Sequence, residues 1–220
     1  MRILPFAAAL TLLPLAAVAQ EAPAAEEPAA PAAVQDLALA PRHAPGPFVE
    51  YASLTCPHCA NWHGESYPRL KADFIDQGQV RLIFREVYFD RFGLWASIVA
   101  RCGGEMRFFP MLERLYAEQQ DWVGDGEPAA IADNLRRIGL ASGLSGEQLD
   151  ACLSDEARAE ALVSWYQANA EADGIDSTPT FLINGEKYSN MAWADMEALI
   201  EAELAEVAPA GTAPAEAPTE

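Results

Sequence analysis

Two cysteines separated by two residues constrain this chain more than any other feature of its sequence. They stand at the ends of residues 56–59, a few positions after an apolar run over residues 48–51 that predicts a short buried strand. Ser53 and Thr55 are typical of turns and helix N-caps, and Pro57 suits a first helical turn, where its missing N–H costs nothing. The sequence therefore predicts a strand, a turn and then a helix that begins close to the first cysteine.

The place of Cys56 in this pattern predicts a reactive thiol. At a helix N-terminus its sulfur meets unpaired backbone N–H groups and the positive end of the helix dipole, and both favour the thiolate. His58, when protonated, adds a positive charge beside the sulfur, and such sites have a thiol pKa of about 3.5 to 7.5. Cys59 lies one helical turn further on, close enough to form a small disulfide with Cys56. This arrangement is typical of a thiol–disulfide redox site.

Other chemistry also uses cysteines at this spacing. A C-x-x-C pair is half of many zinc sites, and His58 and His63 offer nitrogen ligands. Structural zinc sites usually use two such pairs, whereas the other two cysteines, Cys102 and Cys152, are far apart in the sequence. Haem attachment needs His directly after the second cysteine, and Ala60 stands there. A zinc site and a plain structural disulfide remain alternatives to redox chemistry.

Residues 1–19 have the pattern of a secretory signal peptide. Arg2 precedes an apolar run over residues 3–18, and residues 17–19, Ala-Val-Ala, have small side chains at the two positions that cleavage needs. We expect Gln20 to begin the mature chain, with an uncleaved, membrane-anchoring signal as the alternative. Export predicts an oxidising compartment, and a short signal led by one arginine favours the bacterial periplasm.

The chain is strongly acidic, with 33 Asp and Glu against 14 Lys and Arg and a formal net charge of -19. This charge argues against a nucleic-acid partner and against adsorption to anionic lipid. Three histidines are too few for a histidine-rich metal protein. We therefore expect neither nucleic acid nor a bound metal.

Low-complexity segments flank a single predicted domain. Residues 20–46 are rich in Ala, Pro and Glu and predict a disordered or semi-extended linker, and residues 206–220 predict a disordered tail. Residues 47–205 have the length of one domain with a real hydrophobic core.

The apolar pattern at the start of the domain predicts two neighbouring strands. A helix over residues 57–77 follows the first strand, and residues 80–87 form a second buried strand. A right-handed crossover through the helix makes the two strands parallel. Helical patterns then fill about residues 90–176, which indicates a long helical insert.

After the insert, the chain returns to strand character at residues 180–183. Asn184 and Gly185 form the strongest short hairpin signal, and residues 186–188 are the returning strand. An amphipathic helix over residues 191–205 ends the domain. The predicted order is β, α, β, helical insert, β, β, α.

Four features together make the sequence resemble the DsbA-like thiol–disulfide oxidoreductases of the thioredoxin superfamily. They are the segment 49–51 leading into Cys-Pro-His-Cys, the helical insert, residues 177–181 (Ser-Thr-Pro-Thr-Phe), and the Asn-Gly turn of the final hairpin. The resemblance covers about residues 47–205. It implies an α/β, thioredoxin-like fold with an inserted helical domain.

The resemblance implies roles for the residues around the cysteine pair. Cys56 is the nucleophile, Cys59 is the buried partner that closes the disulfide, and Pro57 and His58 form the dipeptide associated with the oxidising branch. Glu50 resembles the buried acid that accepts a proton from the second cysteine during exchange. A glutamate whose carboxylate reaches solvent from an edge strand is the alternative for Glu50.

The resemblance also implies a substrate loop opposite the cysteines. Pro179 corresponds to the family's cis-proline, although the base rate for X–Pro bonds favours trans. Thr178 offers its backbone polar groups to an extended client segment, as in strand addition. Trp62 is expected to pack in the core, and His63 is open to either a packing or a functional role.

Cys102 and Cys152 are not needed by the redox core, and the resemblance points to the DsbA subgroup with a second disulfide in the helical insert. We expect these two residues to pair. A second redox-active pair is the alternative, although neither cysteine has a close-spaced partner.

These expectations describe a periplasmic, monomeric protein dithiol oxidase without a cofactor other than its own disulfide. The resemblance implies exported, folding proteins with free thiols as substrates and a DsbB-like membrane partner that re-oxidises the enzyme. One alternative is a reductase or isomerase on the same fold, although residues 20–46 are too rich in Pro and Ala for a dimerisation domain. The other is a non-catalytic metal carrier that uses Cys56, Cys59 and His58.

Overall fold

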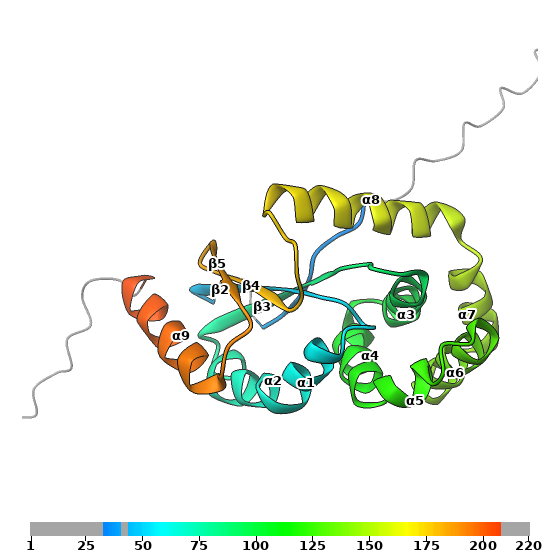
Figure 1. Ribbon diagram of the computed structural model, residues 1–220, viewed down its shortest axis with the longest axis horizontal. Coiled ribbons are helices and arrows are strands. Elements are labelled where there is room, and N and C mark those ends of the chain that lie inside the picture. Colours follow the sequence, from blue (N-terminus) through cyan, green and yellow to red (C-terminus); the bar gives the residue numbers. More distant parts are fainter. Residues whose placement is uncertain (1–32, 41–43, 208–220) are drawn as a thin grey trace, which may run out of the picture. The chain divides into compact units, whose positions relative to one another are not determined.

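The computed structural model describes residues 33–40 and 44–207 (Figure 1). The expected signal peptide and most of the expected linker lie outside the described residues, as do residues 208–220 of the expected tail. Among the helices that are described, none is both long and apolar enough to cross a membrane.

The strands of the described chain form one mixed sheet in the order β1-β3-β2-β4-β5. Their bounds are β1 Leu37–Leu39, β2 Gly46–Ala52, β3 Val80–Glu86, β4 Thr180–Ile183 and β5 Glu186–Ser189. The predicted parallel pairing of β2 with β3 is confirmed, and the other neighbours pair antiparallel. The order places β2, which leads into the cysteine pair, at the centre of the sheet.

The short strand β1 corrects the prediction that residues 20–46 are all linker. Leu37 pairs with Phe84 and Leu39 pairs with Leu82 along the free edge of β3. Leu37 is buried and belongs to the hydrophobic core. A three-residue strand has too short a pattern to be read from composition, and it exists here because β3 offers an open edge.

The helices and the π-helical turn η1 of the described chain follow the predicted order. Their bounds are α1 Pro57–Glu65, α2 Tyr67–Leu70, η1 Lys71–Ile75, α3 Arg91–Cys102, α4 Glu105–Ala117, α5 Gln119–Val123, α6 Pro128–Ala141, α7 Gly146–Leu153, α8 Glu156–Ala172 and α9 Trp193–Val207. The predicted insert therefore comprises α3 to α8, and α9 extends into the first residues of the expected tail.

The single helix predicted over residues 57–77 is wrong in detail, because the chain forms α1, α2 and η1 there. Pro68 lies in the first turn of α2 and has no N–H to continue the hydrogen bonds of α1. The apolar positions still point inward, since Trp62, Tyr67, Leu70 and Phe74 are all buried.

The two faces of the sheet are covered by different helices (Figure 1). Because side chains alternate along a strand, Phe48 and Glu50 of β2 face α1, whereas Tyr51 faces α8. Phe48 stacks with Trp62 of α1 at 6.3 Å between ring centroids. The Tyr51 hydroxyl donates to the Asp173 carboxylate, which follows α8 directly, at 2.5 Å. The start of α1 thus lies over the face of β2 that carries Glu50.

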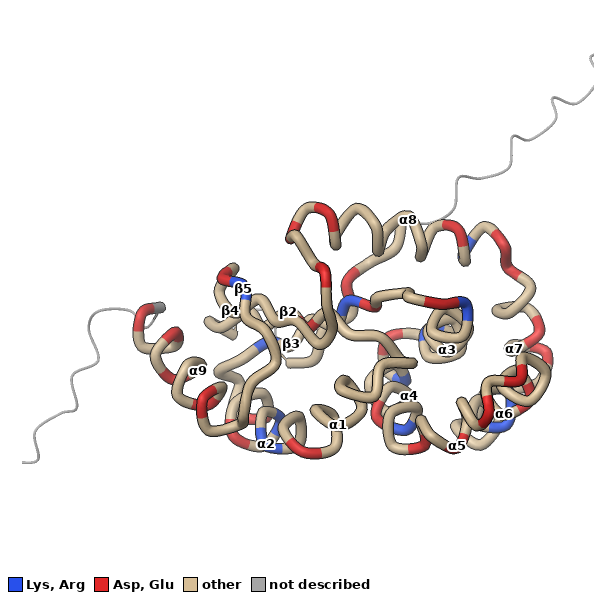
Figure 2. The backbone as a smooth tube through the Cα atoms, viewed as in Figure 1, with Lys and Arg blue, Asp and Glu red and all other residues tan. Residues whose placement is uncertain are grey.

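Acidic residues are spread along the helices, and Lys and Arg are fewer (Figure 2). In α9 the charged residues are all Asp or Glu. The excess of negative charge noted in the sequence is therefore carried by the folded domain itself.

Candidate active site

The cysteine motif begins α1, with Cys56 as the residue that caps the helix. Its backbone N–H donates to the Ser53 carbonyl at 3.1 Å, and no side chain caps the first turn. Ser53 and Thr55 therefore do not cap the helix as predicted, and the Thr55 hydroxyl donates to the Asp90 carboxylate at 2.8 Å. The N–H groups of the first turn consequently remain available to the Cys56 sulfur.

The environment of Cys56 stabilises its thiolate. The pKa of this half-buried thiol is lowered to about 5, chiefly by a hydrogen bond from the Cys59 thiol, with burial opposing the shift. The Thr178 side chain and the backbone N–H groups of Cys59 and His58 add to the lowering. This pKa lies within the range expected from the sequence.

Cys59 has the opposite character. Its side chain is fully buried, and burial raises the pKa of this thiol far above its ordinary value. The hydrogen bond to Cys56 and the negative charge of Glu50 raise it further. The pair therefore combines an accessible thiolate with a buried thiol that keeps its proton.

The two residues between the cysteines are exposed and act differently from one another. Pro57 occupies the first turn of α1, where no N–H is needed. His58 contributes to the low pKa of Cys56 through its backbone N–H, whereas the sequence predicted a contribution from its imidazole charge. His58 is exposed at the start of α1.

Glu50 is fully buried, which contradicts the alternative of a carboxylate that reaches solvent. Its two oxygens lie 2.9 and 3.1 Å from Nε2 of His63, itself only 6 % exposed. β2 is also a central strand rather than an edge strand. The acid thus lies beneath the cysteines, as the resemblance implied, and is held by a histidine.

The loop before β4 faces the cysteines. The Thr178–Pro179 peptide bond is cis, and the Cys56 thiol donates to the Thr178 carbonyl at 3.6 Å. Thr178 Oγ1 is buried and has no nitrogen or oxygen partner among the described residues, and the Thr178 side chain lowers the pKa of both thiols. The structure therefore brings Thr178 and Pro179 to the reactive sulfur.

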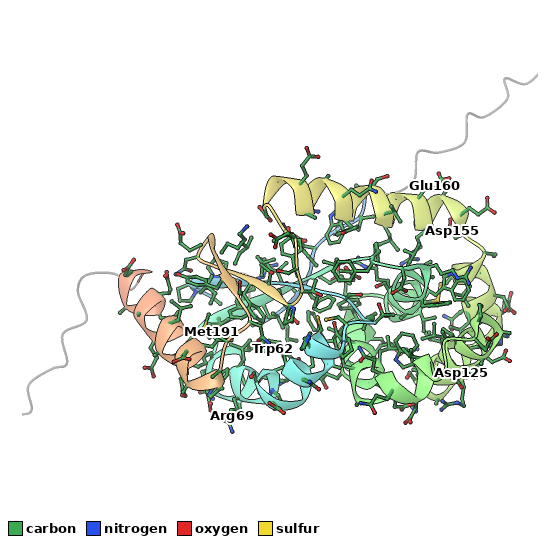
Figure 3. All side chains as sticks on the ribbon, in the orientation of Figure 1. Trp62, Arg69, Asp125, Asp155, Glu160 and Met191 are labelled. Carbon is green, nitrogen blue, oxygen red and sulfur yellow. A yellow bond between two sulfur atoms is a disulfide. The ribbon has the colours of Figure 1, made fainter. Side chains whose placement is uncertain are left out.

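Trp62 packs in the interior, as expected (Figure 3). Its ring lies 4.9 Å from that of Phe181 in β4. Its role is to hold α1 against the sheet.

Two residues of the insert contact residues 53–56, the cysteine loop that leads from β2 into α1. Neither of them was identified from the sequence as part of the site. The Gln119 amide donates to the carbonyls of Leu54 at 2.8 Å and Cys56 at 3.0 Å, and the Tyr116 hydroxyl donates to the Ser53 carbonyl at 3.2 Å. Gln119 continues the helical spacing of the apolar face at residues 111–116. A polar residue on this otherwise apolar helix face was the sequence signal that could have pointed to Gln119.

Cys102 and Cys152 form a disulfide between the end of α3 and α7. Both lie in the insert, and neither is among the residues that surround Cys56. Within residues 33–40 and 44–207, no three His, Cys, Asp or Glu side chains gather as a metal site would require.

A sequence model described as thioredoxin matches residues 33–202, so the chain belongs to this family. A solved structure, Wolbachia pipientis α-DsbA1, has a TM-score of 0.71 and 25% identity, covering 79% of this chain and 92% of that one. The predicted α/β, thioredoxin-like fold with a helical insert, and the resemblance to DsbA-like proteins, are confirmed.

The relatives of known sequence carry names of the same kind. A protein-disulfide oxidoreductase of Rickettsia bellii is 31% identical over 159 residues, which cover 72% of this chain and 60% of the relative. Disulfide bond formation protein D of Bacillus subtilis is 27% identical over 172 residues, 73% of each chain. The chain spans 60% or less of the length of the Rickettsia relatives.

Proposed function

We propose that this protein is a thiol:disulfide oxidoreductase that donates the Cys56–Cys59 disulfide to other proteins. The observation that carries this proposal is the opposite character of the two thiols: Cys56 is accessible with a pKa of about 5, and Cys59 is buried with a raised pKa. Only Cys56 is placed to exchange with an external sulfur.

The reaction starts with a client thiolate that attacks Sγ of Cys56. The bond between Cys56 and Cys59 breaks, a mixed disulfide forms at Cys56, and Cys59 leaves as a thiolate that takes up a proton. A second client thiolate then attacks the client sulfur of the mixed disulfide. Cys56 leaves as a thiolate, the client gains a disulfide, and two electrons have passed to the enzyme.

The low pKa of Cys56 favours the oxidising direction. A stable thiolate is a good leaving group, and it stabilises the reduced enzyme relative to the disulfide form. Donation of the disulfide to a client is then downhill. We propose that the Thr178 backbone, two residues before β4 and outside its strand ladder, holds an extended client segment next to Cys56; the contact of its carbonyl with the Cys56 thiol supports this.

We further propose that the protein acts as a monomer in the bacterial periplasm on exported proteins with free thiols. The signal-peptide pattern of residues 1–19 supports export, and an oxidising compartment suits a disulfide donor. A DsbB-like membrane protein is proposed to restore the disulfide, by exchange at Cys56. A reductase or isomerase, and a metal carrier at Cys56, Cys59 and His58, are the competing functions.

The equilibrium of the Cys56–Cys59 pair in graded glutathione buffers tests the proposed direction. We expect a potential above about −180 mV, in the oxidising half of the thioredoxin-like range. A pair that stays oxidised in strongly reducing buffers contradicts the oxidase proposal and favours a reductase. The metal content of protein purified with reductant distinguishes the oxidoreductase from the metal carrier. A metal carrier is expected to contain stoichiometric zinc or copper.

A Cys59→Ser variant tests the mechanism. It is expected to accumulate a mixed disulfide with a model client that carries a disulfide, because the Cys56 thiolate attacks that bond and no second enzyme thiol is present to release the client. The matched Cys56→Ser variant, which keeps the buried thiol, is expected to trap nothing. Equal trapping by both variants contradicts the assignment of Cys56 as nucleophile.

A further inference from the structure

His63 has a position that the proposed mechanism does not yet use. It follows Cys59 by four residues on α1, so both side chains lie on the helix face that is turned toward the sheet. Its Nε2 lies 2.9 Å from the buried carboxylate of Glu50. Its Nδ1 is buried and has no hydrogen-bond partner among the described residues. One ring nitrogen thus holds the acid, and the other is free to gain or lose a proton.

A cavity of about 330 Å³ reaches this histidine from the surface. Its lining comes from α1, α2, η1 and α4 and includes His63, Tyr67 and Tyr116. Exposed residues such as Gly64 and Pro68 also line it, so the cavity opens to solvent. Glu50, by contrast, is fully buried and is not among the lining residues. The imidazole therefore lies between the carboxylate and the solvent-accessible cavity.

The two tyrosines whose rings pack against His63 keep their hydroxyl protons at physiological pH. The rings of Tyr116 and Tyr67 lie 4.1 and 4.9 Å from the imidazole, and burial raises the pKa of both. Tyr67 donates to the exposed Glu113 carboxylate at 2.9 Å. Neither tyrosine changes charge between pH 5 and 8, so a change of charge beside Glu50 has to come from elsewhere.

The remaining charged groups of the cavity lie at its outer edge. Lys71 donates to Asp76 at 2.7 Å, and both side chains are more than a third exposed. Such surface pairs are well screened and act weakly on a buried group. An imidazole, by contrast, ordinarily changes its charge between pH 5 and 8. His63 is the imidazole in direct contact with Glu50.

We propose that His63 is a positioning residue that controls, by its own protonation, how well Glu50 accepts the proton of Cys59. The inference rests on the proposed function and concerns the step that closes the disulfide. In that step the S–H bond of Cys59 breaks and its proton passes to Glu50. The Cys59 thiolate attacks Sγ of Cys56 in a mixed disulfide, and the bound thiol leaves as a thiolate that is protonated by solvent.

Neutral His63 donates its Nε2–H to the carboxylate and leaves its basicity largely intact. Protonated His63 adds a full positive charge at hydrogen-bond distance, which favours the ionised form of Glu50 and makes it a poorer base. Closure of the disulfide is therefore fast when His63 is neutral and slow when it is protonated. The cavity supplies the route by which solvent protonates the ring.

The experiment starts from protein that carries glutathione on Cys56, prepared at low pH, where closure is slow. After a jump to a chosen pH between 5 and 8, acid quenching and mass spectrometry follow the loss of glutathione. We expect the wild-type rate to fall about tenfold from pH 8 to pH 5, following the loss of neutral imidazole. In His63→Gln, whose amide still donates to Glu50 but does not ionise, the fall is expected to be less than threefold.

Two further variants make the outcome decisive. Cys59→Ser is expected to retain glutathione at every pH, which shows that closure is the step observed. Glu50→Gln is expected to close at least tenfold more slowly and with a steeper dependence on pH than the wild type, because Cys59 must then lose its proton to solvent base. This variant also serves if His63→Gln does not fold. A wild-type profile in either His63→Gln or Glu50→Gln overturns the inference, whereas failure to glutathionylate Cys56 overturns the proposed function.

Discussion

At the scale of single residues, the site depends on two cysteine side chains whose surroundings give their thiols very different pKa values. Cys56 lies at the uncapped start of α1 and receives hydrogen bonds, so it is stabilised as a thiolate. Cys59, one turn later, is buried against the sheet and keeps its proton. Four residues of one helix thus span the change from solvent to core, and this change of environment creates the two roles.

The low pKa of Cys56 predicts how the stability of the reduced protein depends on pH. The folded pKa of about 5 lies below the ordinary 9.0, so the folded state binds fewer protons between these values. The free energy of unfolding of the reduced protein should therefore rise from pH 5 to 9, and the gain is lost as pH falls through 5. The slope stays below about 1.4 kcal/mol per pH unit, because the thiol is half exposed and solvent-screened.

Urea unfolding of the reduced protein at several pH values checks this dependence. A reduced Cys56→Ala variant is the control, since it lacks the titrating thiol and keeps Cys59. The difference in unfolding free energy between the two proteins is expected to grow with pH. A difference that is constant across pH 5 to 9 rules out the lowered pKa.

At the scale of elements, the insert does more than cover the sheet. α4 and α5 supply Tyr116 and Gln119, which donate hydrogen bonds to three carbonyls of the cysteine loop, those of Ser53, Leu54 and Cys56. These contacts fix the path of the chain from β2 into α1. The direction of the first helical N–H groups toward the Cys56 sulfur depends on that path.

Removal of the Gln119 amide should therefore loosen the start of α1. Gln119 is 5 % exposed, and Gln119→Ala removes the side-chain donor of the buried Leu54 carbonyl and one of the two donors of the Cys56 carbonyl, at a cost of about 1–3 kcal/mol in unfolding free energy. The thiolate absorbance of Cys56 is expected to titrate at higher pH in the same variant. Gln120→Ala, at the exposed neighbouring position of α5, is the matched control and should change neither quantity. Equal effects of both substitutions contradict a positioning role for Gln119.

At the scale of the whole described chain, two features hold the insert together as a support for the site. Its helices share the main hydrophobic core with α1 and the sheet, through residues such as Phe108, Leu112 and Trp122. The disulfide between Cys102 and Cys152 joins α3 to α7 across a sequence separation of 50. The insert is thus tied to itself covalently and to the thioredoxin-like part by packing.

Loss of that disulfide should lower stability without changing the chemistry at Cys56. For a loop of this length, the chain-entropy model gives about 4 kcal/mol, with measured losses of about 2–5 kcal/mol. The double variant Cys102→Ser/Cys152→Ser is expected to unfold at lower urea concentration and to keep the redox potential of the Cys56–Cys59 pair. A changed potential supports the alternative that the second disulfide takes part in redox chemistry.

The sequence by itself determined the strong, local features of this protein. The strand over residues 180–183 has the predicted bounds, and the helix that follows the first strand starts at Pro57. These signals are local, because a few neighbouring side chains decide a turn, a cap or a helix start. The helical insert was also predictable, since its apolar positions recur at helical spacing over many turns.

Only the tertiary structure decided which distant residues meet. β1 exists because β3 has an open edge. The pairing of Glu50 with His63 depends on α1 lying across β2, and the contact of Gln119 with the cysteine loop depends on the fold of the insert. Burial and hydrogen bonding between remote segments are set by packing, and no local pattern in the sequence encodes them.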